Sequence, residues 1–356
     1  MLTVISIDEA EKWDNIVKSF KHYDVYYLSG YSKAFQIHGD GDPLLFYYED
    51  SKIKVINVVM KRDIANSENF QGKLIEDSQF DLATPYGYGG VLVEGKADKE
   101  SLIEFDKEYS QLCKCRGFIC EFVRFHPILE NHRTFENLYE ISKLGKTISM
   151  DLESKDKIWC NLTSKNRNMV RKAQNAGVEI YWGRDAELYK KFISMYNDTM
   201  ERDSAKEYYY FKEEFYTSIL NDFKNHAVVF YAVYETIPIA MSIILFANYQ
   251  MHYHLSTSNR EYQHLAPTNL LLYEAACWGS ENGYKTFHLG GGLGSSEDSL
   301  YKFKSSFNRN SDNTFEIGKK IFNNEKYEAL VNILSANGAI EIDTKFFPQY
   351  RAELII

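Results

Sequence analysis

The sequence predicts an α+β fold of two modules with mixed sheets and a cleft between the modules. The chain has 356 residues, which is long for one hydrophobic core and comfortable for two domains. Helical segments, strand hairpins and single strands follow one another without the strict alternation of a purely parallel sheet. The two halves also repeat one series of elements: a strand hairpin, a helix that ends at a glycine followed by an aromatic residue, and a strand.

Hydrophobic periodicity predicts the elements of the first half. In chain order they are a helix (6–20), a strand (24–28), a hairpin (43–62), a loop shaped by Pro and Gly (84–95), a helix (98–115) and a strand (117–127). Ser6 and Glu9 have the spacing of a capping box at the start of the first helix. Two β-rich runs flank the turn EDSK in the hairpin.

The same reasoning predicts the second half. Its elements are a helix (157–177), two further helices (185–200 and 210–223), three strands (227–257), a helix (266–283), a strand (284–289) and a short helix (299–307). Gly177 and Gly283 are expected to end their helices. We therefore expect modules at residues 1–150 and 151–312, with a tail (313–356) that packs back on the first module.

Composition restricts the function. Hydrophobic residues make up 44% and charged residues 26% of the chain, which is typical of a globular protein. The net charge of −9 disfavours a broad nucleic-acid surface, so no DNA partner is expected. The five cysteines lack the spacing of a zinc site, and no metal is expected. No signal peptide or membrane-spanning run is visible, so we expect a cytoplasmic protein without a transmembrane segment.

The stretch LGGGLGSSEDSLYKFKSSFN (289–308) crowds four glycines before a short helix. It lacks the Gly-Lys pair of a Walker loop, and Ser295 stands where a dinucleotide fingerprint needs its third glycine. A strand end, a flexible corner and a helix remain, with Ser295 and Asp298 at capping-box spacing. Lys304 lies on the edge of the apolar face of this helix. Two readings stay open: a lysine that covers core surface, or a cation directed at an oxyanion or a phosphate.

Other polar residues are candidates for binding or catalysis. Thr268 and Asn269 follow Pro267 at a helix start, where free N–H groups receive anions, although an ordinary capped helix fits equally. His252 and His254 are expected to share a strand face, and His254 is a candidate general base or a structural histidine.

An arginine pair, a tyrosine-rich loop and a strand with Arg124 and His126 complete the candidates. Arg167 and Arg171, at i and i+4, suit either a fork for a diphosphate-linked acceptor or a solvated helix face. Tyr86 and Tyr88 flank a glycine in TPYGYGG, which favours the wall of a sugar or peptide site, or a simple turn. In a separate stretch, EFVRFHP, Arg124 and His126 alternate along one strand, and a buried arginine there needs an ion pair or a bound anion.

The series from LAPTNLLLYEAACWGSENGYKTFHLGGG to SLYKFKSSFN resembles the Fem-type peptidyltransferases of cell-wall bridge synthesis. TPYGYGG, EFVRFHP followed by Asn131, and WCNLTSKNRNMVRKAQNAGVEI are similar to the same group, so the resemblance runs from about 81 to 308. It implies two tandem domains of the Gcn5-related N-acetyltransferase (GNAT) superfamily, with 151–312 as the catalytic domain. It also implies that Lys304 lies near the oxyanion and that basic residues bind acceptor phosphate. Separately from the resemblance, we expect the donor to contact Thr268 and Asn269 at the helix start and Gly291 in the glycine stretch.

The resemblance implies an acyl- or aminoacyl-transferase that acts on an amine of a cell-envelope or peptidoglycan precursor, small or lipid-linked, or of a sugar nucleotide. The donor is acyl-CoA, with acetyl-CoA as one candidate, or aminoacyl-tRNA. The chain lacks the helical-hairpin arm of some members, so tRNA is not favoured. It carries QHLAPTN where acetyl-CoA enzymes have a glycine-rich pyrophosphate loop. The alternative is a catalytically silent module that binds a glycan or peptide in a biosynthetic complex.

Overall fold

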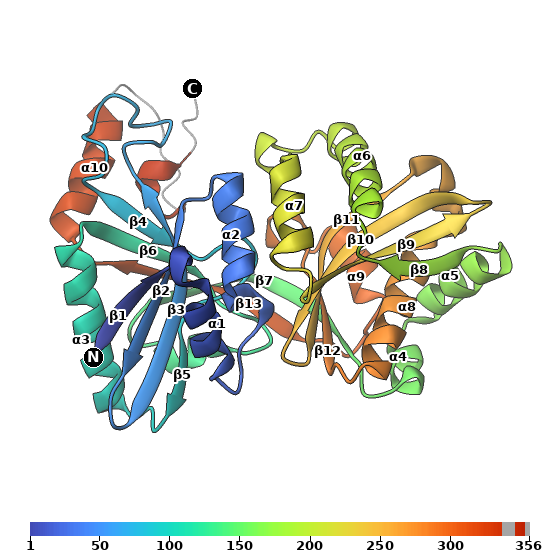
Figure 1. Cartoon of the computed structure of the whole chain (residues 1–356), viewed down its shortest axis with the longest axis horizontal. Coiled ribbons are helices and arrows are strands. Elements are labelled where there is room, and N and C mark those ends of the chain that lie inside the picture. The colour runs from blue at the N-terminus through green and yellow to red at the C-terminus, as the bar shows by residue number, and fades with distance from the viewer. Residues whose placement is uncertain (337–345, 353–356) are drawn as a thin grey trace. The chain divides into compact units, whose positions relative to one another are not determined.

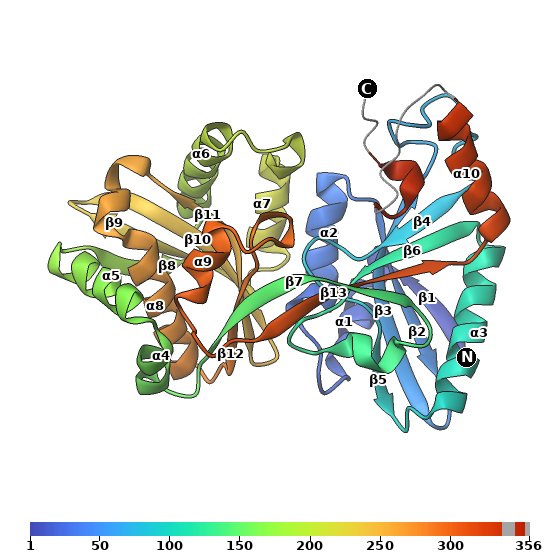
Figure 2. The same cartoon turned by 180° about the vertical axis from the view of Figure 1, so that it is seen from behind.

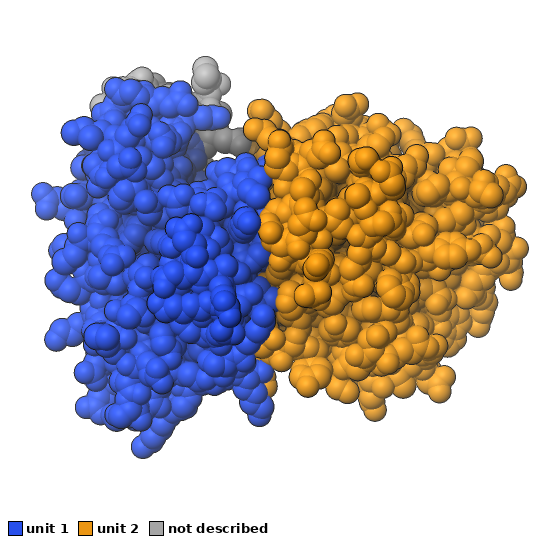
Figure 3. Space-filling view, in the orientation of Figure 1, with its two compact units in different colours: residues 1–21, 26–143, 315–356 blue, residues 22–25, 144–314 orange. Residues whose placement is uncertain are grey.

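The structure is a computed structural model that describes residues 1–336 and 346–352. It divides into two compact units, drawn in blue and orange in Figure 3: unit 1 with residues 1–21, 26–143 and 315–356, and unit 2 with residues 22–25 and 144–314. The predicted α+β class is confirmed, because each unit has its own mixed sheet covered by helices (Figure 1). Parts of the expected C-terminal tail, 337–345 and 353–356, lie outside the described residues.

The sheet of unit 1 has the order β1-β2-β3-β4-β6-β13, and β5 pairs with the first part of β3. The strands are β1 (Leu2–Ser6), β2 (Asp42–Glu49), β3 (Ile53–Asp63), β4 (Phe80–Ala83), β5 (Leu92–Gly95), β6 (Phe118–Arg124) and β13 (Asn313–Ile321). β4 and β6 run parallel, because a long connection through a helix returns the chain to the same end of the sheet. The other pairs are antiparallel.

The helices of unit 1 bury aromatic faces against this sheet. They are α1 (Ala10–Lys18), α2 (Ser29–His38), α3 (Lys99–Cys115) and α10 (Asn324–Ala336). Phe105, Tyr109 and Cys113 recur every four residues along α3, so they form one buried stripe that packs in the core with Phe46 and Phe118.

The sheet of unit 2 has the order β7-β12-β11-β10-β9-β8. The strands are β7 (Glu140–Asp151), β8 (Glu179–Gly183), β9 (Ala227–Tyr234), β10 (Ile237–Ala247), β11 (Gln250–Ser258) and β12 (Thr286–Gly290). β11 and β12 form its parallel pair, and the other pairs are antiparallel. This repeats the parallel pair of unit 1, as the similar element series of the two halves predicts.

Helices cover the sheet of unit 2, as Figure 2 shows from behind. They are α4 (Lys155–Asn161), α5 (Ser164–Asn175), α6 (Ala186–Arg202), α7 (Glu213–Asn221), α8 (Pro267–Glu281) and α9 (Ser299–Ser305). α8 is buried against β9, β10 and β11 and lies beside α5. None of the helices in the described part of the chain is both long and apolar enough to cross a bilayer.

Two predicted elements are wrong. Residues 24–28 do not form a strand: Val25–Tyr27 is a 3-10 turn that leads into α2, which the sequence did not reveal. Aromatic content suggested a strand, but Tyr31 and Phe35 instead form the buried face of a helix. The helix predicted at 157–177 is two helices. The chain is extended at Leu162, and the Thr163 hydroxyl accepts the Asn166 N–H and starts α5.

Candidate active site

The glycine stretch forms a corner between β12 and α9. Gly290 has φ of +78°, in the left-handed region that favours glycine. A Cβ atom at Gly291 would lie 2.8 Å from the Lys146 carbonyl oxygen, so no side chain fits there. Asp298 caps α9 by accepting the Tyr301 N–H at 2.8 Å, and not Ser295 as the sequence predicts. The corner thereby fixes the start of the helix that carries Lys304.

Lys304 is buried, with 8% of its surface exposed. Its ammonium donates to the Gly291 carbonyl at 2.7 Å and lies 5.9 Å from the centre of the Tyr253 ring. Burial lowers the pKa of Lys304 to about 8, and the charge of Asp298 offsets only part of this effect. The structure therefore brings together two predicted site residues, Lys304 and Gly291.

Tyr253 is a neighbour of Lys304 that the sequence analysis missed. It lies on β11, where the Ser242 and Ser256 hydroxyls contact each other at 3.0 Å. Burial raises the pKa of Tyr253, while side-chain hydrogen bonds with these two serines act in the opposite direction. In the sequence, Tyr253 stands between His252 and His254 in MHYHLST, and only the two histidines were considered as candidates.

His254 lies at a β-bulge. Leu255 pairs with Ile243 and Tyr253 pairs with Ile244, so His254 is the extra residue and the regular alternation assumed for His252 and His254 is broken. Burial and the nearby His252 lower the pKa of His254 to about 3. A general base works best with a pKa near the operating pH, so this environment does not favour that role.

Thr268 and Asn269 occupy the first turn of α8. Ala266 precedes the helix in the left-handed region, and the Asn269 N–H bonds to its carbonyl at 3.2 Å. The Asn269 side chain donates to the Asn166 side chain at 2.8 Å, which ties α8 to α5. Within the described residues, Thr268 has the one N–H group of this turn that lacks an acceptor. This helix start therefore offers a single N–H group to an anion.

Arg167 and Arg171 do not form a fork. The Arg167 guanidinium donates to the Leu162 carbonyl at 2.5 Å and to the Ser164 hydroxyl at 3.1 Å, so it completes the end of α4. The Arg171 guanidinium lies 5.0 Å from the centre of the Trp159 ring. A role in binding acceptor phosphate stays a prediction.

Tyr86 and Tyr88 lie in unit 1, in a loop packed by aromatic contacts. The Tyr86 ring stacks on Phe35 with centroids 5.5 Å apart, and its carbonyl accepts the Tyr31 hydroxyl. The Tyr88 ring lies 6.0 Å from the His126 ring, and burial raises the Tyr88 pKa. The structure therefore brings together two predicted residues in unit 1, Tyr88 and His126.

Arg124 is the last residue of β6, and His126 follows two residues later. His126 is buried, and its Nδ1 accepts the N–H groups of Ile128 and Leu129 at 3.2 Å. This ring therefore caps a turn. The Arg124 guanidinium lies 5.9 Å from the centre of the Phe122 ring, a cation–π contact that half-buries it.

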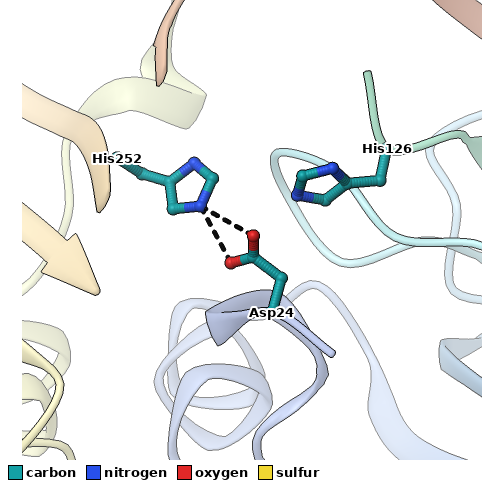
Figure 4. A group of neighbouring side chains, drawn as sticks. All are labelled: Asp24, His126 and His252. Carbon is teal, nitrogen blue, oxygen red and sulfur yellow. Dashed lines mark hydrogen bonds and ion pairs between the residues drawn. The ribbon is translucent and has the colours of Figure 1, made fainter. Parts of the chain in front are cut away.

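Asp24 and His252 form a buried pair in unit 2. His252 Nε2 lies 2.8 and 2.9 Å from the two carboxylate oxygens of Asp24, as Figure 4 shows. The His288 ring lies 5.7 Å from the His252 ring on the adjacent strand β12. The carboxylate orients the imidazole, so Asp24, which was expected to begin a strand, positions a histidine instead.

Comparisons with known proteins agree with this fold. Residues 163–305 match the acetyltransferase (GNAT) domain family. The structure of FemX is 14% identical, with a TM-score of 0.67, and the match covers 92% of this chain and 99% of that one. The C-terminal domain of a putative lysylphosphatidylglycerol synthetase from Agrobacterium fabrum is 12% identical, with a TM-score of 0.55 and coverage of 93% and 96%. No curated protein sequence matches. These matches confirm the expected resemblance: residues 163–305 are similar to the acetyltransferase (GNAT) domain family, and the chain has the fold of FemX.

Proposed function

We propose that the chain is an acyl- or aminoacyl-transferase that moves an acyl group from an activated ester to an amine of a cell-envelope precursor or sugar nucleotide. The observation that carries this proposal is the buried ammonium of Lys304, held by the Gly291 carbonyl inside the matched acetyltransferase domain. Residues 151–312 are the proposed catalytic domain.

The chemistry of acyl transfer explains why a buried cation is useful. Attack of an amine on a thioester or ester carbonyl places negative charge on the carbonyl oxygen in the tetrahedral intermediate. A donor that is fixed beforehand, in surroundings with little water, stabilises that charge without having to reorganise. Lys304 has three N–H groups and gives one to Gly291, so two remain for such an oxyanion.

The surroundings of Lys304 also restrict the proton transfers. Because the pKa of Lys304 is about 8, most protein molecules carry a protonated Lys304 at pH 7, as oxyanion stabilisation requires. The imidazole of His254 is neutral at the same pH because its pKa is about 3. We therefore propose that the attacking amine loses its proton to water or to the leaving group, and that transfer depends on positioning and on the Lys304 charge.

The donor is the part of the proposal that is tested first. We favour an acyl thioester, acyl-CoA, over aminoacyl-tRNA because the net charge of the chain is −9. The purified protein is incubated with a panel of acyl-CoAs and with a charged tRNA, and its melting temperature is measured. A donor that binds only the folded state raises this temperature. A shift with an acyl-CoA supports the thioester, a shift with charged tRNA alone redirects the proposal to aminoacyl transfer, and no shift with any donor contradicts it.

A further inference from the structure

Unit 2 contains a polar hollow of about 350 Å³ whose lining does not include Lys304. It lies where β7 ends and β12 begins, between α4 and the segment after α9. The lining residues are Ser149, Met150, Asp151, Lys157, Asn161, Lys285, Thr286, Asn308, Asn310, Ser311, Asp312 and Asn313. Its volume falls within the range of small-molecule sites, which begins at about 300 Å³.

Asparagines dominate this hollow, and they hold one another in place. The Asn310 side chain donates to the Asn161 Oδ1 at 2.9 Å, and the buried Asn308 side chain donates to the Ser149 carbonyl at 2.7 Å. Asn313 donates to the Ser149 hydroxyl at 2.6 Å. The amides are therefore oriented in advance, and a ligand that uses them loses little side-chain entropy from the protein.

Several polar atoms of the lining remain available. Among the described residues, no hydrogen-bond partner is present for the Asn161 Nδ2, for the Oδ1 atoms of Asn310 and Asn313, or for the Thr286 hydroxyl. They include a donor, two acceptors and a hydroxyl that serves as either. Neighbouring hydroxyl groups of a sugar ring need this mixture, because each of them donates and accepts.

The charges of the hollow argue against an anionic ligand. Lys157 lies 3.9 Å from Asp151, and Asp312 is paired with Lys146 at 3.2 Å. Lys285 is exposed, and it alone among the charged lining residues has no ion pair within the described structure. Phosphate recognition uses clustered cations, which this lining lacks.

The hollow is separate from the proposed catalytic lysine. Thr286 begins β12, whereas Gly291, which binds the Lys304 ammonium, follows its end. Neither Lys304 nor Gly291 is among the lining residues, and the lining residue nearest to Lys304 in the sequence is Asn308. The hollow and the contact between Lys304 and Gly291 therefore use different side chains.

We propose that this hollow is a second binding site, for an uncharged saccharide, that works independently of acyl transfer. Its asparagine and hydroxyl groups bind ring hydroxyls. Met150 is the one large apolar residue among the described lining residues and none of them is aromatic, so hydrogen bonds supply most of the affinity and binding lies in the millimolar range.

The test uses the full chain labelled with ¹⁵N at asparagine side chains. Neutral disaccharides, including cellobiose, maltose and diacetylchitobiose, are titrated into it, with inorganic phosphate and a dipeptide as comparison ligands. We expect a disaccharide to shift the side-chain amide signals of Asn161, Asn310 and Asn313 together. Shifts of these signals by phosphate or dipeptide alone, or by none of the ligands, overturn the proposal.

Two variants test whether the hollow itself binds. Thr286→Val removes a hydroxyl and keeps the shape, and Asn310→Ala removes an exposed amide. Each is expected to weaken saccharide binding about fivefold to tenfold, the effect of one neutral hydrogen bond. Asn168→Ala, at an exposed asparagine of α5 outside the hollow, is the matched control and should bind as the wild type. Unchanged affinity in both hollow variants, with folding verified by melting temperature, contradicts the site.

The Lys304→Met variant separates this proposal from the proposed function. It should retain full saccharide binding, because the hollow does not use Lys304. Saccharide binding without transfer activity therefore leaves the hollow standing while the transferase proposal fails, and transfer activity without saccharide binding gives the reverse result.

Discussion

Replacing Lys304 by methionine should make the protein more stable. The pKa of the buried ammonium is about 8, against 10.5 for an exposed lysine. This difference of 10.5 − 8 = 2.5 means that the charged form is held at a cost of about 3 kcal/mol at pH 7, since one pKa unit corresponds to about 1.4 kcal/mol. The variant also leaves the Gly291 carbonyl without its hydrogen-bond donor, which destabilises it by about 1 kcal/mol. The expected net gain in unfolding free energy is about 2 kcal/mol.

The pH dependence of this gain follows from the direction of the shift. Between pH 8 and 10.5 the unfolded wild type binds more protons at Lys304 than the folded state does, so wild-type stability from this group rises with pH. The advantage of Lys304→Met should therefore be constant below pH 8 and shrink steadily as the pH rises to 10.5.

Urea unfolding of both proteins at a series of pH values measures the effect, and Lys302→Met is the control. Lys302 is exposed on the same helix, so this change should alter stability by less than about 0.5 kcal/mol. A Lys304→Met variant that is less stable than the wild type, or whose advantage persists unchanged at pH 10.5, refutes the reasoning about this buried cation.

Three further predictions concern the scaffold. Desolvation raises the pKa of the buried Glu121 carboxyl, so its contribution to stability is complete at acid pH and is lost as the pH rises through its folded pKa. In urea unfolding at a series of pH values, Glu121→Gln should therefore reduce the fall of the unfolding free energy with rising pH. The buried Asp81 carboxylate accepts hydrogen bonds from Arg62 at 2.6 Å and from Arg351 at 2.5 Å, and these two positive charges lower its pKa. Asp81→Asn should therefore cost about 3–5 kcal/mol of unfolding free energy at pH 7, and a loss under 1 kcal/mol contradicts the pairing. Gly292→Ala should lower the melting temperature and the transfer rate, because its Cβ would collide with the Asp298 carboxylate that caps α9; wild-type values for both would contradict the packing of this corner.

Much of the fold follows from local patterns in the sequence. The hairpin β2–β3 and the helix α3 have regular spacing and clear ends, so the prediction and the structure agree within a few residues. The corner before α9 follows from its glycines. In each case, nearby residues decide the conformation.

The missed features depend on distant partners or on single capping bonds. Residues 25–27 are rich in β-forming side chains, yet no strand in the described part of the chain pairs with them, and they form a 3-10 turn that leads into α2. The break at Leu162 depends on one hydroxyl, that of Thr163, which the hydrophobic period does not register.

Side-chain pairing in the candidate site was least predictable. Lys304 was identified by its helix position and the resemblance, but Tyr253 comes from another strand, β11. Asp24 and His252 are separated by 228 residues, and their contact exists only in the folded chain. Arg167 and Arg171 have the spacing of a phosphate fork, but the Arg167 guanidinium donates a hydrogen bond to the Leu162 carbonyl.

The most direct measurement of the central claim is product formation by mass spectrometry. Wild type, Lys304→Met and Lys302→Met are each given the donor that raises the melting temperature, with isotopically labelled acyl group, and a panel of amino sugars and peptides with free amines. Loss of one oxyanion donor lowers turnover by about 10²–10³. We predict labelled amide from the wild type and from Lys302→Met, and at least a hundredfold less from Lys304→Met. Equal product from all three proteins, or none from the wild type with any acceptor, would contradict the proposed role of Lys304.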